Sequence, residues 1–329
     1  MDWGIPKKQS NQNEWENDLG KSNSIKYLNI ALLTAGIAAL PQTLCAAEAQ
    51  HLNPVIEKLA AGKPFIGLQA GSLTAENART MARADADFVY VDMEHTPMDF
   101  PALHQFAVGM VDKATAIQKG NVQPNVALFA RFAPYGREGA QWIAKQALDA
   151  GLMGVIFNAI DTPEQAMLAV QNMRYPQKRG AKYQKPAGLR GVGATGAAWV
   201  WGISGTEYER RADVWPLNPD GDLLAIMMIE STEGLKNVDA IAAVPGVGAF
   251  FLGAGADLRQ SLGVEDNSPE LEQARQTILK ACLKHNVACG LSETTGPAIA
   301  RRLAEGWKMI RTTEVAYAQW RASSSQDKK

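Results

Sequence analysis

The chain has 329 residues, of which 46% are hydrophobic and 20% are charged, a composition typical of a globular protein with a sizeable core. Its 33 basic and 34 acidic residues give a formal net charge of -1, which argues against nucleic acid or an anionic membrane as a partner. After residue 50, no apolar run approaches the roughly 20 residues that a membrane-spanning helix needs, so no membrane partner is expected for that part of the chain.

The N-terminal region has the pattern of an export leader. Residues 27–40 form an apolar run with the length of a signal-peptide core, and two lysines precede it. Residues 47–49, Ala-Glu-Ala, then follow with the small-x-small spacing that a signal peptidase requires. We therefore expect residues 1–49 to be a leader and residues 50–329 to be one exported, periplasmic domain. The alternatives are a buried first helix, or a mis-assigned translation start in a cytoplasmic protein.

Two cysteines, Cys282 and Cys289, remain in the expected mature domain. Two cysteines in about 280 residues do not make a fold built on disulfides, even in an oxidising compartment. We interpret both as buried apolar side chains rather than as a bridge.

From about residue 64 onward, short β-branched or aromatic runs alternate with helix-length amphipathic segments, which is typical of a parallel α/β protein. Eight such units predict a TIM (β/α)8 barrel. A doubly wound open sheet is the alternative, but residues 67–71 lack the glycine spacing of a phosphate-binding turn. The predicted strands are 65–69, 88–92, 126–131, 154–157, 224–230, 249–253, 287–291 and 308–311, and clear helical patterns cover 138–150, 163–173 and 270–284.

The connection between residues 158 and 222 is much longer than one helix with two short loops. It carries a predicted helix at 163–173 and a pair of tryptophans, Trp199 and Trp201. We expect this excursion to be a lid or a subunit contact.

Polar residues follow several of the predicted strands, where the active site of such a barrel lies. They are Asp92, Glu94, His95, Arg131, Glu230 and Asp257. Glu230 and Asp257 follow neighbouring strands, so their carboxylates can meet at the barrel mouth, where a cation or a shared proton would relieve their repulsion. Oxygen ligands with open positions favour Mg²⁺ or Mn²⁺. The alternative role for each residue is to cap the helix that follows.

His95 lies three residues after Asp92, a spacing that lets the carboxylate accept an imidazole N–H and leaves the other nitrogen as a base near neutral pH. A purely structural histidine in a turn is the alternative. Arg131, on a buried strand, would face an anionic substrate or else form an ion pair with Asp92 or Glu94.

Several strings of residues, taken in order, resemble the HpcH/HpaI family of metal-dependent 2-keto acid aldolases. They are 92–95 (Asp-Met-Glu-His), Arg131, 148–151 (Leu-Asp-Ala-Gly), 174–176 (Arg-Tyr-Pro), 190–193 (Arg-Gly-Val-Gly), 229–230 (Ile-Glu) and 253–258. The resemblance implies a TIM barrel of the phosphoenolpyruvate/pyruvate type, assembled as a homo-oligomer, usually a hexamer. It also implies cleavage of a 4-hydroxy-2-oxo acid to pyruvate and an aldehyde, which would be the small-molecule partners.

By the same resemblance, Glu230 and Asp257 would be the ligands of a divalent metal, and Arg131 would stabilise charge on the keto oxygen. His95, oriented by Asp92, would take the proton of the C4 hydroxyl. Substrate contacts would come from Glu94, Gly253, Ala254, Gly255 and Ala256, and Asp149 would reach the site of a neighbouring subunit.

The chain departs from the family pattern at Met228, Asn158 and Ala254, where the family commonly has a polar residue and two prolines. Its metal-aspartate loop is also one residue longer. Two other functions therefore stay open: an exported keto-acid-binding barrel without turnover, and a citrate-lyase-type enzyme that acts on a thioester.

Overall fold

The computed structural model describes residues 51–132, 140–193 and 195–326. They belong to one compact unit, Cys45–Lys329. The expected leader, residues 1–49, lies outside the described residues. No helix among the described residues is both long enough and apolar enough to cross a bilayer.

Eight parallel strands form a closed barrel, in the order β4-β3-β2-β1-β9-β8-β7-β6, with β4 pairing back onto β6. This closure confirms the predicted barrel and excludes the open sheet. A ninth, two-residue strand, β5, pairs with β6 from outside this ring and was not predicted. The strands are β1 (Phe65–Gln69), β2 (Phe88–Met93), β3 (Ala127–Phe132), β4 (Gly154–Phe157), β5 (Val214–Trp215), β6 (Leu223–Met228), β7 (Ala249–Phe251), β8 (Ala288–Ser292) and β9 (Met309–Arg311).

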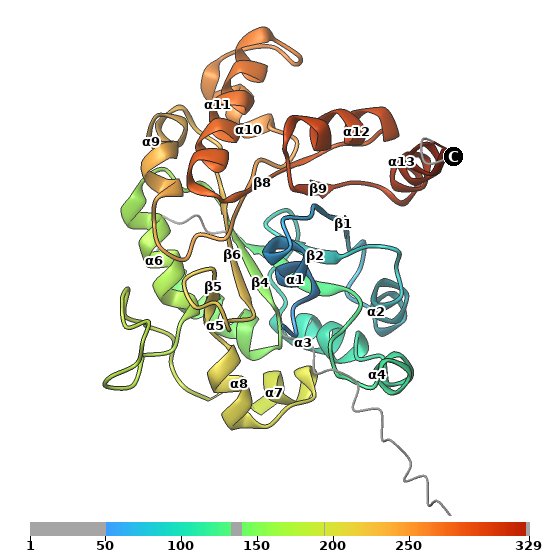
Figure 1. The fold of residues 1–329 in the computed structure, drawn as a ribbon, viewed down its shortest axis with the longest axis vertical. Helices are drawn as coiled ribbons and strands as arrows, with labels where there is room; N and C mark the ends of the chain where they lie inside the picture. The colour runs from blue at the N-terminus through green and yellow to red at the C-terminus, as the bar shows by residue number, and fades with distance from the viewer. Residues whose placement is uncertain (1–50, 133–139, 194, 327–329) are drawn as a thin grey trace, which may run out of the picture. The chain divides into compact units, whose positions relative to one another are not determined.

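Helices surround the strands and cover the outer face of the barrel (Figure 1). The predicted helix at 163–173 is observed with the same bounds, and the one at 270–284 extends by a residue at each end. The helices are α1 (Pro54–Ala60), α2 (Ala75–Ala82), α3 (Phe100–Gly109), α4 (Lys113–Lys119), α5 (Gln141–Asp149), α6 (Pro163–Met173), α7 (Thr195–Trp201), α8 (Gly205–Arg211), α9 (Thr232–Ala242), α10 (Ala256–Leu262), α11 (Pro269–His285), α12 (Gly296–Glu305) and α13 (Glu314–Gln326).

Aromatic rings fill the lower part of the barrel interior. Phe88 stacks on Phe129 with ring centroids 5.3 Å apart, and Phe65 meets Phe88 edge-on at 5.5 Å. Glycines leave room for these rings, because a Cβ at Gly67 would lie 2.3 Å from the Phe88 ring and one at Gly154 would lie 2.6 Å from the Phe129 ring. Side chains alternate between the two faces of a strand, so the inward positions after Phe88 are Tyr90 and Asp92. Polar groups therefore lie above the apolar rings, toward the C-terminal ends of the strands.

The long connection between β4 and β6 carries the helices α7 and α8. These two helices do not cover the mouth of the barrel, which is the end where the strands have their C-termini. The indole of Trp201 donates to the carbonyl of Gly151 (2.8 Å), and the hydroxyl of Tyr208 donates to the carbonyl of Leu148 (3.0 Å). Both carbonyls precede β4, so α7 and α8 lie together at the N-terminal end of the strands (Figure 1). The expectation of a lid is therefore wrong for these two helices.

Cys282 of α11 and Cys289 of β8 form a disulfide, and both are buried. The interpretation of these residues as unbridged apolar side chains is therefore wrong. The reason is local, because Asn286 ends α11 in the left-handed conformation (φ 55°) and turns the chain back, so that the two Cα atoms lie 5.8 Å apart.

We predict that replacing both residues of this disulfide (Cys282→Ala with Cys289→Ala) lowers the free energy of unfolding by about 2 kcal/mol. The bond closes a loop of only a few residues, which sets the entropy it removes from the unfolded chain. Urea unfolding with and without reductant measures the effect. Reductant should destabilise the wild type and leave the double variant unchanged; equal sensitivity of both would contradict the prediction.

Candidate active site

Asp92 is the centre of a hydrogen-bonded group at the C-terminal ends of β2 and β3. It is 7% exposed, and its carboxylate accepts from Arg131 Nε (3.2 Å) and Nη2 (2.5 Å). It also accepts from the backbone N–H groups of Glu94 (3.2 Å) and His95 (3.4 Å) and from the amide of Gln69 (3.3 Å). Burial opposes ionisation of Asp92, but the hydrogen bonds and charge of Arg131 outweigh it, so the pKa of Asp92 lies below its ordinary value.

Arg131 is paired with two carboxylates rather than left for a substrate alone. It lies opposite Asp92 in the register of β2 and β3, and its Nη1 lies 2.9 Å from Glu94 Oε2. This is the ion pair that the sequence left open as an alternative. Although burial opposes it, these acids raise the pKa of Arg131 above its ordinary value. A guanidinium has five N–H donors, so Arg131 still keeps donors for a substrate oxygen.

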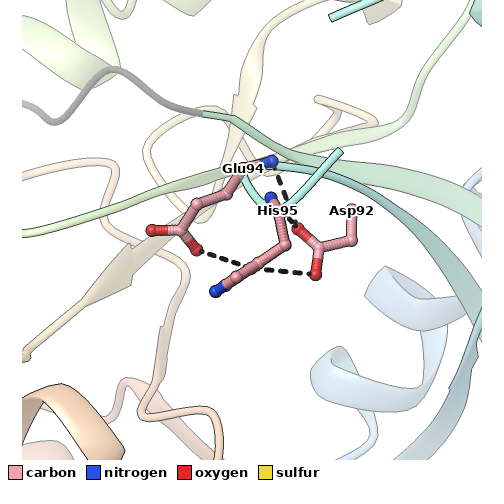
Figure 2. Close-up of side chains that lie close together, drawn as sticks. All are labelled: Asp92, Glu94 and His95. Atoms are coloured by element: carbon pink, nitrogen blue, oxygen red, sulfur yellow. Dashed lines mark hydrogen bonds and ion pairs between the residues drawn. The ribbon is translucent and has the colours of Figure 1, made fainter. Parts of the chain in front are cut away.

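His95 lies above this ion pair, with its side chain 65% exposed. Figure 2 shows its ring between the carboxylates of Asp92 and Glu94, which lie 3.3 and 3.5 Å from Nδ1. Arg131 Nη2 lies 2.9 Å from the same nitrogen. When Nδ1 carries the proton, Asp92 is its acceptor and Nε2 is free to act as a base. When Nδ1 instead accepts from Arg131, the proton of the neutral ring is on Nε2.

Glu94 completes this group. Burial raises the pKa of Glu94, and the charges of Asp92 and Asp257 add to the increase, against the opposing effect of Arg131 and His95. Ligand atoms of Asp92, Glu94 and His95 lie within 4.8 Å of one another, a geometry that could hold a metal ion. Because Arg131 already forms ion pairs with both acids, we consider this group a poor cation site.

Glu230 follows β6 and is 8% exposed. Burial raises its pKa to about 7; the hydrogen bond from Ala159 opposes this, and the charges of Asp257 and Glu94 add to it. The alternative role as a helix cap is wrong, because Ser231 caps α9 by accepting from the N–H of Gly234 (2.9 Å). Glu230 is therefore a buried acid at the mouth, and no basic side chain among the described residues forms an ion pair with it.

A bulge after β4 holds Glu230 in place. In an unbroken parallel ladder, the N–H of residue 159 would donate to the carbonyl of Met228, but that of Ile160 does so instead (3.0 Å). The freed N–H of Ala159, whose φ is 46°, donates to Glu230 Oε2 (3.1 Å). Asn158 in the same bulge is fully buried, and its amide has no hydrogen-bond partner among the described residues.

Asp257 lies in the first turn of α10 and is exposed. It does not cap that helix, since the N-cap is Gly255, and its charge raises the pKa of both Glu230 and Glu94. The predicted substrate loop, Gly253, Ala254, Gly255 and Ala256, is the turn from β7 into α10. Gly253 (φ 55°) and Gly255 (φ 81°) are left-handed, a conformation that glycine adopts without strain.

Asp149 does not join the other predicted residues within one chain. It ends α5, which leads into β4, so it lies at the N-terminal end of the strands, opposite the mouth. Its carboxylate accepts from Lys145 (2.5 Å) and from the buried Arg190 (2.7 Å). A helix of this fold runs back against its strand, which is why a residue at its C-terminal end cannot reach the mouth.

Sequence reasoning missed a polar group just below the mouth. Gln69 Oε1 accepts from the hydroxyl of Tyr90 (3.0 Å) and from Arg311 Nη2, while the Gln69 amide donates to Asp92. Tyr90 lies two residues before Asp92 and opposite Gln69 in the register. The period of two along the strand could therefore have predicted that Tyr90 points to the same side as Asp92.

Comparison with known proteins gives the same family as the sequence motifs. Residues 66–301 match the model of the HpcH/HpaI aldolase/citrate lyase family. The chain is 32% identical to a 2-keto-3-deoxy-L-rhamnonate aldolase of Salmonella gallinarum over 254 residues, which are 76% of this chain and 82% of the relative. These matches confirm the resemblance inferred from the motifs.

Solved structures are similar as well. An HpcH/HpaI aldolase/citrate lyase family protein from Burkholderia cenocepacia aligns with a TM-score of 0.65 and 27% identity, over 84% of this chain and 98% of that one. An HpcH/HpaI aldolase from Desulfitobacterium hafniense aligns with a TM-score of 0.61 and 21% identity, over 83% and 95% of the two chains, which supports the fold alone.

We predict that Glu230→Gln stabilises the metal-free protein at high pH. With a pKa of about 7 in place of 4.5, folded Glu230 binds more protons than the unfolded chain between these values, so stability falls as pH rises through that window. The stability of the variant relative to wild type should therefore increase by about 3 kcal/mol between pH 4.5 and 8. Urea unfolding in chelator measures it; a difference that does not change with pH would refute the assignment.

Proposed function

This chain belongs to the HpcH/HpaI aldolase/citrate lyase family, and we propose that it is a divalent-metal-dependent aldolase with a barrel of the phosphoenolpyruvate/pyruvate type. It is a carbon–carbon lyase, as its named relatives are. In the proposed reaction, a 4-hydroxy-2-oxo acid is cleaved to pyruvate and an aldehyde. The observation that carries the proposal is a pair of carboxylates, Glu230 and Asp257, that follow adjacent strands, with the charge of Asp257 acting on the buried Glu230.

Glu230 and Asp257 fit a hard cation such as Mg²⁺ or Mn²⁺. Both offer oxygen, the donor these ions prefer. Burial raises the pKa of Glu230, and the nearby charges of Asp257 and Glu94 add to the increase, so a cation bound here would favour its ionised form. Of the two carboxylate oxygens of Glu230, Oε2 accepts a hydrogen bond from a described residue and Oε1 does not. Oε1 is therefore open to a ligand. When bound, the cation would supply Lewis-acid stabilisation of negative charge on the keto oxygen of the substrate.

The other residues would handle the proton and the charge. The C4 hydroxyl loses its proton to Nε2 of His95, directly or through a water, while Asp92 holds Nδ1–H. The C3–C4 bond breaks, C4 becomes the aldehyde carbon, and the electron pair is left on the pyruvate enolate. Arg131 donates to its oxygen, and a proton returned to C3 completes pyruvate.

We propose further substrate contacts at the same end of the barrel. Glu94 lies beside His95, where the aldehyde-derived part of the substrate would be, and the turn from Gly253 to Ala256 lies beside Asp257. Both assignments depend on the position of the cation at Glu230 and Asp257.

We also propose that the chain forms a homo-oligomer, with a hexamer as the expected form. Trp142, Trp199 and Val192 are large apolar side chains with 56%, 58% and 68% exposure, which supports contacts with other copies. Because Asp149 lies away from the mouth of its own barrel, any role in the active site would be at that of a neighbouring copy.

For localisation we propose export to the periplasm, on the pattern of residues 1–49. The disulfide between Cys282 and Cys289 supports this proposal, because such bonds persist mainly in oxidising compartments.

We expect the purified protein to release pyruvate from a 4-hydroxy-2-oxo acid in the presence of Mn²⁺. Chelator should abolish the release, and added Mn²⁺ should restore it. Glu230→Ala should be inactive at every Mn²⁺ concentration and should bind Mn²⁺ more weakly by calorimetry. Pyruvate release that is unchanged without metal would refute the mechanism, and metal-dependent binding of keto acids without turnover would favour a binding protein.

His95→Ala should lower kcat by about 100- to 10,000-fold, the contribution typical of a positioned base. The matched control is His104→Ala, since His104 is an exposed histidine on α3 beside Gly196 of α7, which lies at the N-terminal end of the strands. We expect the control to keep the wild-type kcat. A His95 variant with wild-type kcat would exclude this residue as the base.

A further inference from the structure

Arg311 is a second guanidinium inside the barrel, and the aldolase chemistry above does not use it. It ends β9 and lies opposite Gly67 of β1 and Ser292 of β8 in the register. Gly67 is an inward position, because a Cβ there would meet the ring of Phe88. Residues paired across a sheet point to the same face, so Arg311 also points inward. Its intermediate exposure shows that part of the side chain remains accessible.

No carboxylate among the described residues forms an ion pair with Arg311. Two acids are linked to Arg311 by other contacts, and both are engaged elsewhere. Asp92, which shares Gln69 with it, pairs with Arg131 (2.5 Å). Glu293, whose backbone N–H donates to the carbonyl of Arg311, pairs with Arg302 (2.9 Å). Arg311 is therefore unlike Arg131, whose charge is matched by two acids. A partly buried guanidinium without a counter-charge is costly unless an anion joins it.

The partner that Arg311 does have cannot neutralise it. Gln69 Oε1 accepts from Arg311 Nη2 and from the hydroxyl of Tyr90, while Gln69 Nε2 donates to Asp92. These contacts fix the orientation of the amide, with its neutral oxygen toward Arg311. The Nε of Arg311 is buried and has no hydrogen-bond partner among the described residues. Arg311 thus presents a charge and at least one free N–H donor.

We propose that Arg311 binds a carboxylate on the aldehyde-derived half of the substrate, so that this enzyme prefers acidic aldehydes as products or acceptors. The inference rests on the proposed aldolase function and specifies its substrate class. A guanidinium with free N–H donors is well suited to a carboxylate, because both the charge and the planar geometry match.

The position of Arg311 in the barrel selects this half of the substrate. The 2-oxo acid end belongs with Glu230 and Asp257, which follow β6 and β7. His95, which would take the C4 proton, follows β2. In the ring of strands, β9 lies two strands from β2 and two from β7, but the hydrogen bonds of Gln69 link Arg311 to Asp92, on the side of His95. Groups beyond C4 would therefore approach Arg311.

The test compares matched pairs of aldehydes in the synthetic direction, with pyruvate and Mn²⁺. Glyoxylate and glycolaldehyde form one pair, and succinic semialdehyde and butanal form a longer one. For the wild type we expect the acidic member of at least one pair to have the higher kcat/KM. Arg311→Gln should lower kcat/KM for the acidic aldehyde of that pair by about 10- to 100-fold, the range of a lost charge-assisted hydrogen bond. The kcat/KM for the neutral aldehyde should change little. Arg311→Lys should restore part of the preference.

Arg301→Gln is the matched control, because it removes one positive charge from the exposed face of α12, where Arg301 makes only long contacts of 3.8 Å with Glu293 and Glu305. It should keep the wild-type preference, and thermal unfolding should show that the Arg311 variants remain folded. Equal loss for acidic and neutral aldehydes, or a rise confined to the KM of pyruvate, would overturn the inference while leaving the aldolase function intact. Absence of turnover with every aldehyde would instead refute the proposed function.

Discussion

The ion pair between Asp92 and Arg131 is the contact on which the rest of the mouth depends. The two residues lie opposite each other on paired strands, so the fold itself brings them together. From this pair, the backbone of Glu94 and His95 is held by Asp92, and Nη1 of Arg131 reaches Glu94. Without Arg131, two partly buried carboxylates would face each other uncompensated, a strongly unfavourable arrangement.

Charge divides the mouth into parts with different chemistry. Around β2 and β3, Arg131 forms ion pairs with both acids. Its hydrogen bonds and charge outweigh burial and lower the pKa of Asp92, which stays ionised to orient a base. Around β6 and β7, Glu230 has a pKa of about 7 and no matching cation in the described structure. Carboxylates whose environments separate their pKa values in this way usually have separate roles in catalysis.

Much of this arrangement could be predicted from the sequence, because it follows from local patterns. Each barrel strand is a short buried run, such as Leu223–Met228, and the polar residues that come next must gather at one end of a parallel barrel. The remainder depends on contacts that no local pattern encodes. The hydrogen bond between Gln69 and Arg311 joins positions 242 residues apart, and the disulfide depends on a left-handed turn at Asn286. The two-residue strand Val214–Trp215 is too short to have a period.

The packed rings of Phe65, Phe88 and Phe129 also limit how small molecules travel. They close the interior from below, so the route available to a substrate is through the opening where the strands end. In the proposed reaction both products must then leave by the way the substrate entered. The fragment held farther from that opening would be released second, and a trapped keto acid would compete with the next molecule of substrate.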